Sequence, residues 1–389
     1  MSYPGVDDKA VSNIPNASGG RGRRLRIVYV ARNDGTDMRV SKECNSLLKF
    51  GHDVHFVGWR DSVDHDRPDP MPDVPKHFFS SLQGGSALKK LLRAPGFAFH
   101  VGRMVHGLRP DVVHFVNEDL GLLVVSLQRG YGFKSVCDLF DSIELKWGQK
   151  RYPVNVIARL VTKLVHEKSD VLIVTDDARK ARLGTFQKKA HTVSNYPVDV
   201  GEEFALRLPD REGPLRLYVA GTLYAARGLS SLLELLNARD DVEIISAGWL
   251  HDEIAREFIG HPAVDYRGVI KPSESLQVAA SCHAIVALYD PSNENNVMAS
   301  PNKIYDAICI GRPVIINREA AVSHWVSEHD AGYVVRYGDM EELGAVVDAL
   351  NQQRDNMYET AVSLRELFER GYSWDVAERT LLTAYAQYT

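Results

Sequence analysis

The sequence predicts an α/β protein of two doubly wound domains, and three observations support this fold class. Short apolar runs alternate with amphipathic helix patterns between residues 25 and 194, as expected for a parallel sheet with helices on its faces. The segment 201–214 is polar, contains Pro209 and Pro214, and shows no apolar periodicity, so we interpret it as an interdomain linker. The alternation restarts at Leu215 and continues to the end of the chain.

The first domain is predicted over residues 25–200 and begins with a buried strand, because Leu25–Ala31 is a short and almost wholly apolar run. A helix follows over Asp37–Phe50, and Gly51 is placed to end it as a C′ glycine. Further strands are predicted at Asp53–Gly58, Asp111–Val116, Lys134–Leu139, Val171–Thr175 and His191–Ser194. Further helices are predicted at Asp119–Arg129, Val154–Glu167 and Asp177–Leu183. The Pro- and Asp-rich stretch Asp61–Lys76 is expected to be a loop.

The second domain is predicted over residues 215–370. Its strands are expected at Leu215–Ala220, Val242–Ala247, Ala284–Leu288, Pro313–Ile316 and Tyr333–Val335. Its helices are expected at Leu229–Asn237, Asp252–Ile259, Ser273–Ser281, Pro301–Ile310, Ala320–Glu328, Met340–Asn351 and Tyr358–Arg370, and a last helix follows at Trp374–Tyr388. Because open α/β sheets bind ligands at the carboxyl ends of their strands, the tandem arrangement predicts a ligand site in a cleft between the domains.

Composition excludes several classes of protein. The chain of 389 residues has 46 basic and 51 acidic residues and a net charge of −5, which provides no general attraction for nucleic acid. Its 4 cysteines lie far apart, and no zinc-binding or redox spacing can be built from them. A reduced, cytoplasmic compartment fits this use of cysteine. No stretch approaches the roughly 18 apolar residues that a membrane span requires.

Two segments outside the predicted core are basic. Residues 1–24 lack an apolar signal-peptide region and are interpreted as a flexible tail that ends in an arginine-rich patch. The segments Leu88–Arg93 and Ala94–Gly107 look amphipathic. They form either a peripheral contact with a membrane surface or a helix packed on the first domain.

The stretch Ser300–Ile315 carries the strongest chemical signal. Ser300 is a good N-cap and Pro301 fits the first helical position. The N–H groups at such a helix start attract phosphate, and Lys303 adds a full positive charge there. Asp306 shares a helix face with Lys303, and a carboxylate in this place can accept hydrogen bonds from a ribose. The alternative is an ordinary capped helix with an i,i+3 ion pair.

A second segment of the same domain suits the same ligand. In Val219–Leu229 a strand runs into a turn and then into a helix that starts near Gly228. Gly221 allows a close backbone approach, and Arg227 can clamp a diphosphate through two hydrogen bonds. Two such features after strands of one domain predict a shared diphosphate site.

The first domain offers a basic residue of its own. Arg39 lies near the start of the first predicted helix, after the loop that contains Asn33 and Asp34. It either faces the cleft, or is a solvated surface charge, or pairs with Glu43 at i,i+4.

Together these segments resemble the GT-B glycosyltransferases, in particular the retaining family four-like enzymes. The resemblance runs from about Leu25 to Tyr388 and implies two Rossmann-like domains facing across a cleft, of which the first binds the acceptor and the second binds the nucleotide sugar. It implies that the C-terminal helix, residues 371–389, crosses back to the first domain. It also implies that Asp306 binds the donor ribose. The residues that would bind the donor diphosphate are Gly221, Thr222, Arg227, Gly228 and Lys303.

The sequence departs from the family pattern at four positions, and one of these is Arg227 in place of the usual lysine. Thr222 stands where a second basic residue is usual, Met298 where the first of two glutamates is usual, and Phe140 where many relatives have a histidine. Contacts to the donor sugar are therefore expected from Glu294, Asn296 and Ser300. The catalytic or acceptor-positioning role is expected to fall to Asp138, Asp141 or His114. The expected acceptor-side residues are Asn33, Asp34 and Arg39.

The resemblance thus implies transfer of a sugar from a UDP- or GDP-linked donor to a polysaccharide, lipid-linked or natural-product acceptor, with retention of configuration. Helix ends and basic side chains would stabilise the diphosphate as it leaves, so neither a metal nor a cofactor is expected. Two alternatives stay open. One is a nucleotide-sugar epimerase of the same fold, and the other is a non-catalytic GT-B-like binding protein.

Overall fold

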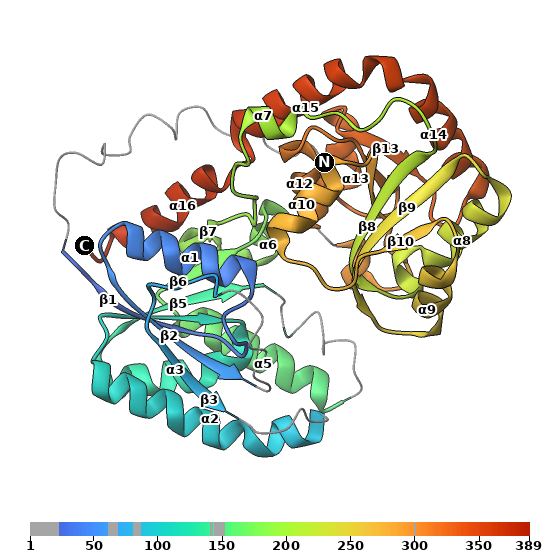
Figure 1. The fold of residues 1–389 in the computed structure, drawn as a ribbon. Helices are drawn as coiled ribbons and strands as arrows, with labels where there is room; N and C mark the ends of the chain where they lie inside the picture. The colour runs from blue at the N-terminus through green and yellow to red at the C-terminus, as the bar shows by residue number, and fades with distance from the viewer. Residues whose placement is uncertain (1–22, 61–68, 81–86, 141–142, 144–151, 299–300) are drawn as a thin grey trace. The chain divides into compact units, whose positions relative to one another are not determined.

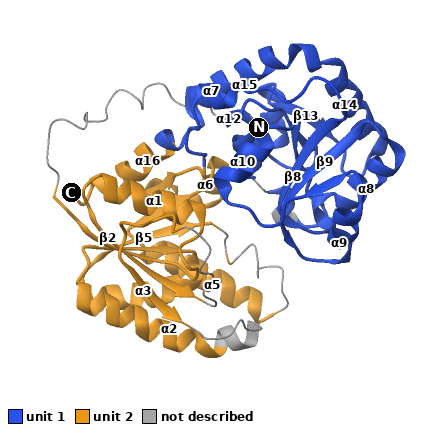
Figure 2. Ribbon diagram, in the orientation of Figure 1, with its two compact units in different colours: residues 1–10, 196–376 blue, residues 11–195, 377–389 orange. Residues whose placement is uncertain are grey.

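The computed structural model describes residues 23–60, 69–80, 87–140, 143, 152–298 and 301–389. These residues fall into two compact units (Figure 2). Residues 23–195 and 377–389 form one, called here the sheet-A unit, and residues 196–376 form the other, the sheet-B unit. The end of the chain therefore belongs with its first half. The tail expected over residues 1–24 lies outside the described residues except for its last two.

The sheet-A unit is built on a parallel sheet of seven described strands in the order β3-β2-β1-β4-β5-β6-β7. Their bounds are β1 Arg26–Val30, β2 Asp53–Arg60, β3 Lys76–Ser80, β4 Val112–Val116, β5 Lys134–Leu139, β6 Val171–Val174 and β7 Ala190–Thr192. In the central strand, Ile27 pairs with Val54 of β2 and with Val112 of β4. The central strands are buried on both faces, which explains why they are continuous apolar runs rather than alternating ones.

Helices cover both faces of this sheet (Figure 1). They are α1 Met38–Lys49, α2 Ala87–Leu108, α3 Glu118–Tyr131, α5 Val154–Lys168, α6 Asp177–Arg182 with the 3₁₀ turn η2 Gly184–Lys189, and α16 Trp374–Ala386. Helices α2, α3 and α5 lie on one face, and α1 and α16 lie on the other. Asp37 starts α1 by accepting hydrogen bonds from the N–H groups of Arg39 and Val40.

All predicted strands of this half are confirmed, but β3 was missed. It is an edge strand with half-buried side chains, and it begins at the last residue of the stretch Asp61–Lys76 that was expected to be a loop. Such a strand has neither the continuous apolar run nor the clean alternation that marks a strand in sequence. Residues 61–68 of that stretch lie outside the described part of the chain.

The sheet-B unit has six described parallel strands in the order β10-β9-β8-β11-β12-β13. Their bounds are β8 Leu215–Leu223, β9 Val242–Leu250, β10 Val264–Tyr266, β11 Ala284–Ala287, β12 Val314–Asn317 and β13 Gly332–Val335. The sequence missed the short β10 and ended β8 and β9 three residues early. Gly221 was expected in a turn but pairs with Gly248 of β9 within the sheet. Gly248 has a φ of +139°, and a Cβ added to it would lie 1.7 Å from the Gly221 carbonyl oxygen.

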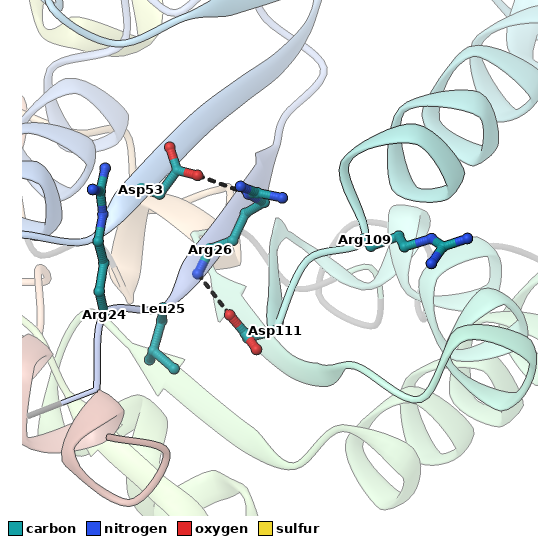
Figure 3. A pocket seen from close by; sticks show the side chains of 6 residues that line it. All are labelled: Arg24, Leu25, Arg26, Asp53, Arg109 and Asp111. Carbon is teal, nitrogen blue, oxygen red and sulfur yellow. Dashed lines mark hydrogen bonds and ion pairs between the residues drawn. The ribbon is translucent and has the colours of Figure 1, made fainter.

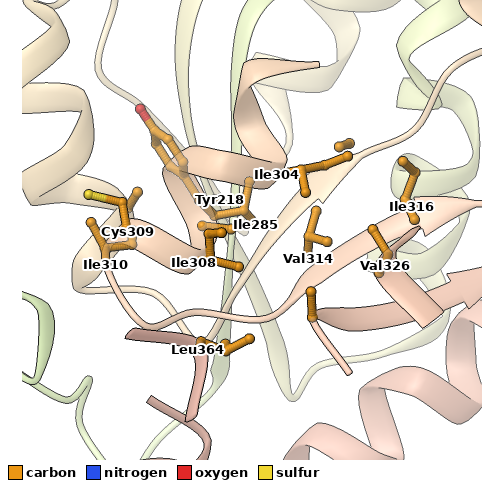
Figure 4. Packing of buried hydrophobic residues seen from close by; sticks show 14 of the residues in the cluster. Tyr218, Ile285, Ile304, Ile308, Cys309, Ile310, Val314, Ile316, Val326 and Leu364 are labelled. Atoms are coloured by element: carbon orange, nitrogen blue, oxygen red, sulfur yellow. The ribbon is translucent and has the colours of Figure 1, made fainter. Parts of the chain in front are cut away.

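Helices again pack on both faces, and the sheet lies between two apolar clusters. The helices are α7 Glu202–Ala205, the 3₁₀ turn η3 Ala225–Arg227, α8 Leu229–Ala238, α9 Glu253–Gly260, α10 Pro272–Ala280, α11 Glu294–Val297, α12 Asn302–Cys309, α13 Ser323–Glu328, α14 Met340–Gln352, the 3₁₀ turn η4 Arg354–Asn356 and α15 Met357–Gly371. Ile304 and Ile308 fix α12 in the cluster that also contains Ile285 of β11 (Figure 4). The segment 201–214, expected to be a linker, contains α7. This helix is attached to the sheet-B unit, because the buried Arg312 guanidinium binds the Ala205 carbonyl.

Candidate functional site

The order of the strands places a topological switch point in the centre of sheet B. Strand β8 lies beside β11, and the chain continues from β8 toward one edge of the sheet and from β11 toward the other. Ligands of open α/β sheets bind outside the carboxyl ends of the strands at such a point. The two loops that follow β8 and β11 meet there, because the Asp290 N–H donates to the Ala226 carbonyl over 2.9 Å.

Gly228 brings these loops together. Its φ of +73° is costly for other residues, and a Cβ on it would lie 2.7 Å from the Cβ of Leu288. The preceding Arg227 is half-buried, and its guanidinium lies 4.3 Å from the centre of the Tyr289 ring. Arg227 is thus held over the carboxyl ends of β8 and β11, as the sequence predicted for a diphosphate-binding residue.

Lys303 and Asp306 form the second half of this site on α12. Their side chains are only 25% and 19% exposed, and their charged atoms lie 3.3 Å apart. Burial raises the pKa of Tyr289 to about 12, with the Arg227 charge lowering it and the Asp306 charge raising it. Tyr289 also packs in the same apolar cluster as Ile304 of α12, so the ring that contacts Arg227 lies against the helix that carries Lys303 and Asp306. The predicted binding of a phosphate and a diol by these residues stays a prediction.

Other predicted donor residues have more mixed positions. Thr222 is exposed in β8 opposite Trp249 of β9. Asn296 is buried, and its amide donates to the Asp290 carbonyl over 2.9 Å, so it supports the loop after β11. Ser300 and the side chain of Glu294 lie outside the described part of the structure. The N-cap of α12 is Pro301, one residue later than expected for a helix capped by Ser300.

Asn317 is a supporting residue that the sequence analysis missed. It ends β12, and its side-chain oxygen accepts a hydrogen bond from the Tyr289 N–H over 2.8 Å. Its amide nitrogen donates to the Glu319 carboxylate over 3.0 Å. A polar residue that closes the apolar run Val314–Asn317 was the only available signal.

Sheet A has its own switch point between β1 and β4. Asn33 and Asp34 lie in the loop after β1, at the carboxyl edge where an acceptor was predicted. The Asn33 side-chain oxygen accepts from the Gly35 N–H over 3.0 Å. The Asp34 carboxylate accepts from the N–H and the hydroxyl of Thr36 over 3.2 and 2.6 Å. Both side chains therefore shape the loop, and their predicted contact with an acceptor stays a prediction.

Four charged or titratable side chains form a buried ionic cluster beside this sheet: Arg39, Glu43, His114 and Asp138. Arg39 is 2% exposed and the other three are 0% exposed. The Arg39 guanidinium binds both oxygens of Asp138 over 2.9 and 3.2 Å and lies 3.1 Å from Glu43. The Nε2 atom of His114 lies 3.5 Å from Glu43 and 3.6 Å from Asp138.

The cluster contains one permanent cation for two carboxylates, so their pKa values move apart. Burial raises the pKa of Glu43 well above its usual range, and the Asp138 charge adds to this effect. Burial is the largest single effect on Asp138 and opposes its ionisation, but the charges and hydrogen bonds of Arg39 and His114 together lower its pKa. Burial lowers the pKa of His114. The surroundings therefore favour the ionised form of Asp138, the protonated form of Glu43 and the neutral form of His114.

This burial bears on three predicted site residues. Arg39, His114 and Asp138 have almost no surface that a substrate could touch, and each is engaged within the cluster. The geometry favours the alternative in which Arg39 pairs with Glu43 over the one in which it faces a cleft. The catalytic and acceptor roles of these residues stay predictions, and Asp141 lies outside the described residues.

Glu43, His114 and Asp138 are also the one group with metal-ligand spacing in the described part of the chain, since their ligand atoms lie within 4.8 Å of one another. Arg39 makes them a poor metal site. Its guanidinium already occupies both oxygens of Asp138, and a divalent cation would have to share the same small space with it.

The hollow shown in Figure 3 lies at the opposite end of sheet A, at the start of β1, β2 and β4. It has a volume of about 420 Å³. The Arg26 side chain pairs with Asp53, and the Arg26 N–H donates to Asp111. These pairs tie the amino ends of three strands together, and ligands of such sheets bind at the other edge. The hollow is therefore not part of the candidate site.

Comparisons with known proteins agree with this geometry. Residues 34–195 match the family model of the glycosyl transferase 4-like domain. No curated protein matches the sequence. The structure of sucrose-phosphate synthase from Thermosynechococcus elongatus is similar, with a TM-score of 0.71 at 16% identity over 93% of this chain and 98% of that chain.

Two further solved structures share the fold. HepE from Anabaena, solved in complex with UDP and glucose, has a TM-score of 0.70 at 12% identity and covers 92% of this chain and 99% of its own. A candidate UDP-N-acetylglucosamine 2-epimerase from Listeria monocytogenes has a TM-score of 0.63 at 11% identity over 93% of this chain and 96% of its own. At such identities these likenesses establish the fold only.

Proposed function

We propose that the chain is a glycosyltransferase whose donor is a UDP- or GDP-linked sugar, because residues 34–195 match the glycosyl transferase 4-like domain and the whole chain has the GT-B fold. One observation carries the choice of donor. The Arg227 guanidinium lies against the Tyr289 ring at the switch point of sheet B, and Tyr289 packs in the same apolar cluster as Ile304 of α12. This helix carries the Lys303–Asp306 pair, so a diphosphate and a ribose would each meet a suitable partner at this end of the sheet. HepE, which shares the fold, was solved with UDP and glucose.

The proposed chemistry follows from where charge develops. As the bond to the sugar breaks, negative charge grows on the departing diphosphate. Arg227 and Lys303 supply positive charge at that place, and groups aimed at developing charge are usually the largest single contribution to catalysis. This leaves no required role for a metal ion. Retention of configuration is proposed from the family resemblance.

We place the acceptor at the carboxyl edge of sheet A. The loops after β1 and β4 meet there at a switch point, and Asn33 and Asp34 lie in the first of them. A polysaccharide, a lipid-linked glycan or a natural product fits this proposal. The specific acceptor depends on loops, which vary more freely than the sheet.

A nucleotide screen tests the donor. We expect UDP or GDP to stabilise the protein in thermal unfolding with EDTA present, since a ligand at ~100 times its Kd adds about 2.7 kcal/mol to the free energy of unfolding. AMP serves as a control nucleotide with a single phosphate. Absence of any shift with UDP, GDP and their sugars would point to a non-catalytic binding protein.

Product analysis separates transfer from epimerisation. We expect nucleotide release from the sugar donor to rise when an acceptor extract is added, with the new bond keeping the anomeric configuration of the donor. Conversion of a UDP-sugar into its epimer without nucleotide release would instead identify an epimerase.

Peripheral membrane contact is proposed for α2, which contains the predicted amphipathic segments. Phe97, Val101 and Val105 pack into the core of the sheet-A unit, whereas Leu92 and Phe99 are 73% and 75% exposed. In the described part of the chain, no helix is both long and apolar enough to cross a membrane. We expect the protein to sediment with phosphatidylglycerol vesicles and a variant with Leu92→Ser and Phe99→Ser to stay in solution. A wild-type protein that stays in solution would remove this contact.

A further inference from the structure

The backbone of Asn117 is strained. This residue follows β4 and precedes α3, and its φ and ψ angles are +62° and +161°. That region is populated almost only by glycine, and a residue with a side chain is held there at a cost of about 1–3 kcal/mol. Some interaction of Asn117 must therefore offset the strain.

Hydrogen bonds to residues at and after the end of the neighbouring strand β5 offset the strain of Asn117. The Asn117 N–H donates to the Asp138 carbonyl over 2.8 Å, and its side-chain oxygen accepts from the Phe140 N–H over 2.9 Å. The next residue, Glu118, accepts from the Ile143 N–H over 3.1 Å. Two consecutive residues after β4 thus fix three positions at and beyond the end of β5.

Other contacts hold the same segment from the interior. The Asp138 carboxylate is bound by both nitrogens of the Arg39 fork, and the Arg39 guanidinium lies 5.0 Å from the centre of the Phe140 ring. Glu118 is completely buried and lies 3.3 Å from Nε2 of His166 on α5. The Arg39 guanidinium and the side chains of Asn117 and Glu118 therefore hold the described positions 138, 140 and 143.

This segment lies at the edge where the proposed acceptor would bind. Strand β4 is one of the two strands at the switch point of sheet A, and β5 is its neighbour. Strained residues persist only where surrounding contacts hold the backbone in place, and they are concentrated at functional sites. We propose that Asn117 is a positioning residue, whose side-chain oxygen fixes the Phe140 backbone and with it the acceptor edge of sheet A. This inference rests on the proposed glycosyl transfer.

The decisive variant is Asn117→Gly, with Asn117→Asp as its matched control. Glycine accepts the same φ and ψ without strain, so we expect a melting temperature equal to that of the wild type or higher. Aspartate keeps an oxygen that can accept from the Phe140 N–H. In hydrogen exchange we expect the Phe140 amide to exchange about tenfold faster in Asn117→Gly and at the wild-type rate in Asn117→Asp.

The same variants test the role in the reaction. With UDP-glucose or GDP-mannose as donor and the acceptor extract present, we expect kcat for sugar transfer to fall about tenfold in Asn117→Gly at unchanged KM, and to be largely retained in Asn117→Asp. A lower melting temperature with unchanged kcat would show that Asn117 only stabilises the fold. Wild-type kcat and wild-type exchange in Asn117→Gly would overturn the proposal altogether. Failure of the proposed function shows itself differently, as a wild-type protein that neither binds nor turns over either donor.

Discussion

Replacing Arg227 or Lys303 with alanine is expected to lower kcat/KM for the nucleotide sugar by about tenfold to a thousandfold, as removal of other charge-stabilising groups does. Arg227 lies at the carboxyl ends of β8 and β11 against the Tyr289 ring, and Lys303 lies in the first turn of α12, which packs in the same apolar cluster as Tyr289. The loss should fall mainly on kcat, because the diphosphate carries most charge when the glycosidic bond is broken. Steady-state kinetics with the donor found in the nucleotide screen measure both parameters.

The two positions should differ in what a conservative replacement restores. Arg227 can bind two phosphate oxygens through its planar fork, so Arg227→Lys should recover only part of the activity. Lys303 acts as a point charge beside Asp306, and Lys303→Arg should be tolerated better if space allows.

Arg211→Ala is the matched control. Arg211 precedes β8, so it lies at the opposite edge of the same sheet, and its side chain is 65% exposed. We expect wild-type kinetics from it. Wild-type kinetics in Arg227→Ala and Lys303→Ala as well would remove the diphosphate site from this part of the fold.

The positions of the candidate donor residues could be predicted from the sequence because each segment that carries them has a local signal. Gly228 sits where a strand turns into a helix, and Pro301 with Lys303 marks the start of another helix. Parallel strands bring such loops to one edge of a sheet, so their convergence follows from topology alone. Tyr289 and Asn317 had no comparable signal, because their roles depend on which side chain meets which loop across two strands.

The acceptor side was harder to predict for a physical reason. Arg39, His114 and Asp138 are polar residues next to predicted loops, and a sequence does not distinguish a polar group that faces solvent from one paired in the interior. Their partners lie far away in the sequence, 99 residues for Arg39 with Asp138 and 271 residues for His114 with Tyr385. The strained backbone of Asn117 could not be predicted either, because the residue type does not determine the φ angle.

The largest effect on stability is expected from Arg39→Met. The variant leaves the Asp138 carboxylate buried without its counter-charge, and breaking a buried ion pair in this way costs about 3–5 kcal/mol. Arg26→Met is the matched control in the same unit. Arg26 pairs with Asp53 at 47% and 27% exposure, and such a surface pair contributes about 0–1 kcal/mol. Urea unfolding followed by circular dichroism measures both variants, and an equal small loss in the two would contradict the role given to Arg39.

The pH dependence of that loss identifies its cause. In the folded wild type the pKa of Asp138 is lowered below its value in the unfolded chain, which is about 4. The Asp138 ion pair therefore stabilises the fold at pH values above the unfolded pKa, and this stabilisation is lost as the pH falls through the folded pKa. Without Arg39, burial is left to raise the pKa of Asp138, and protonation then relieves the unpaired charge. The difference between Arg39→Met and wild type should therefore be largest near pH 7 and shrink as the pH approaches 4. Adding Asp138→Asn to Arg39→Met should recover stability at pH 7, because the buried charge is then gone. A loss of stability caused only by missing side-chain packing would be the same at every pH and would not be recovered by the second substitution.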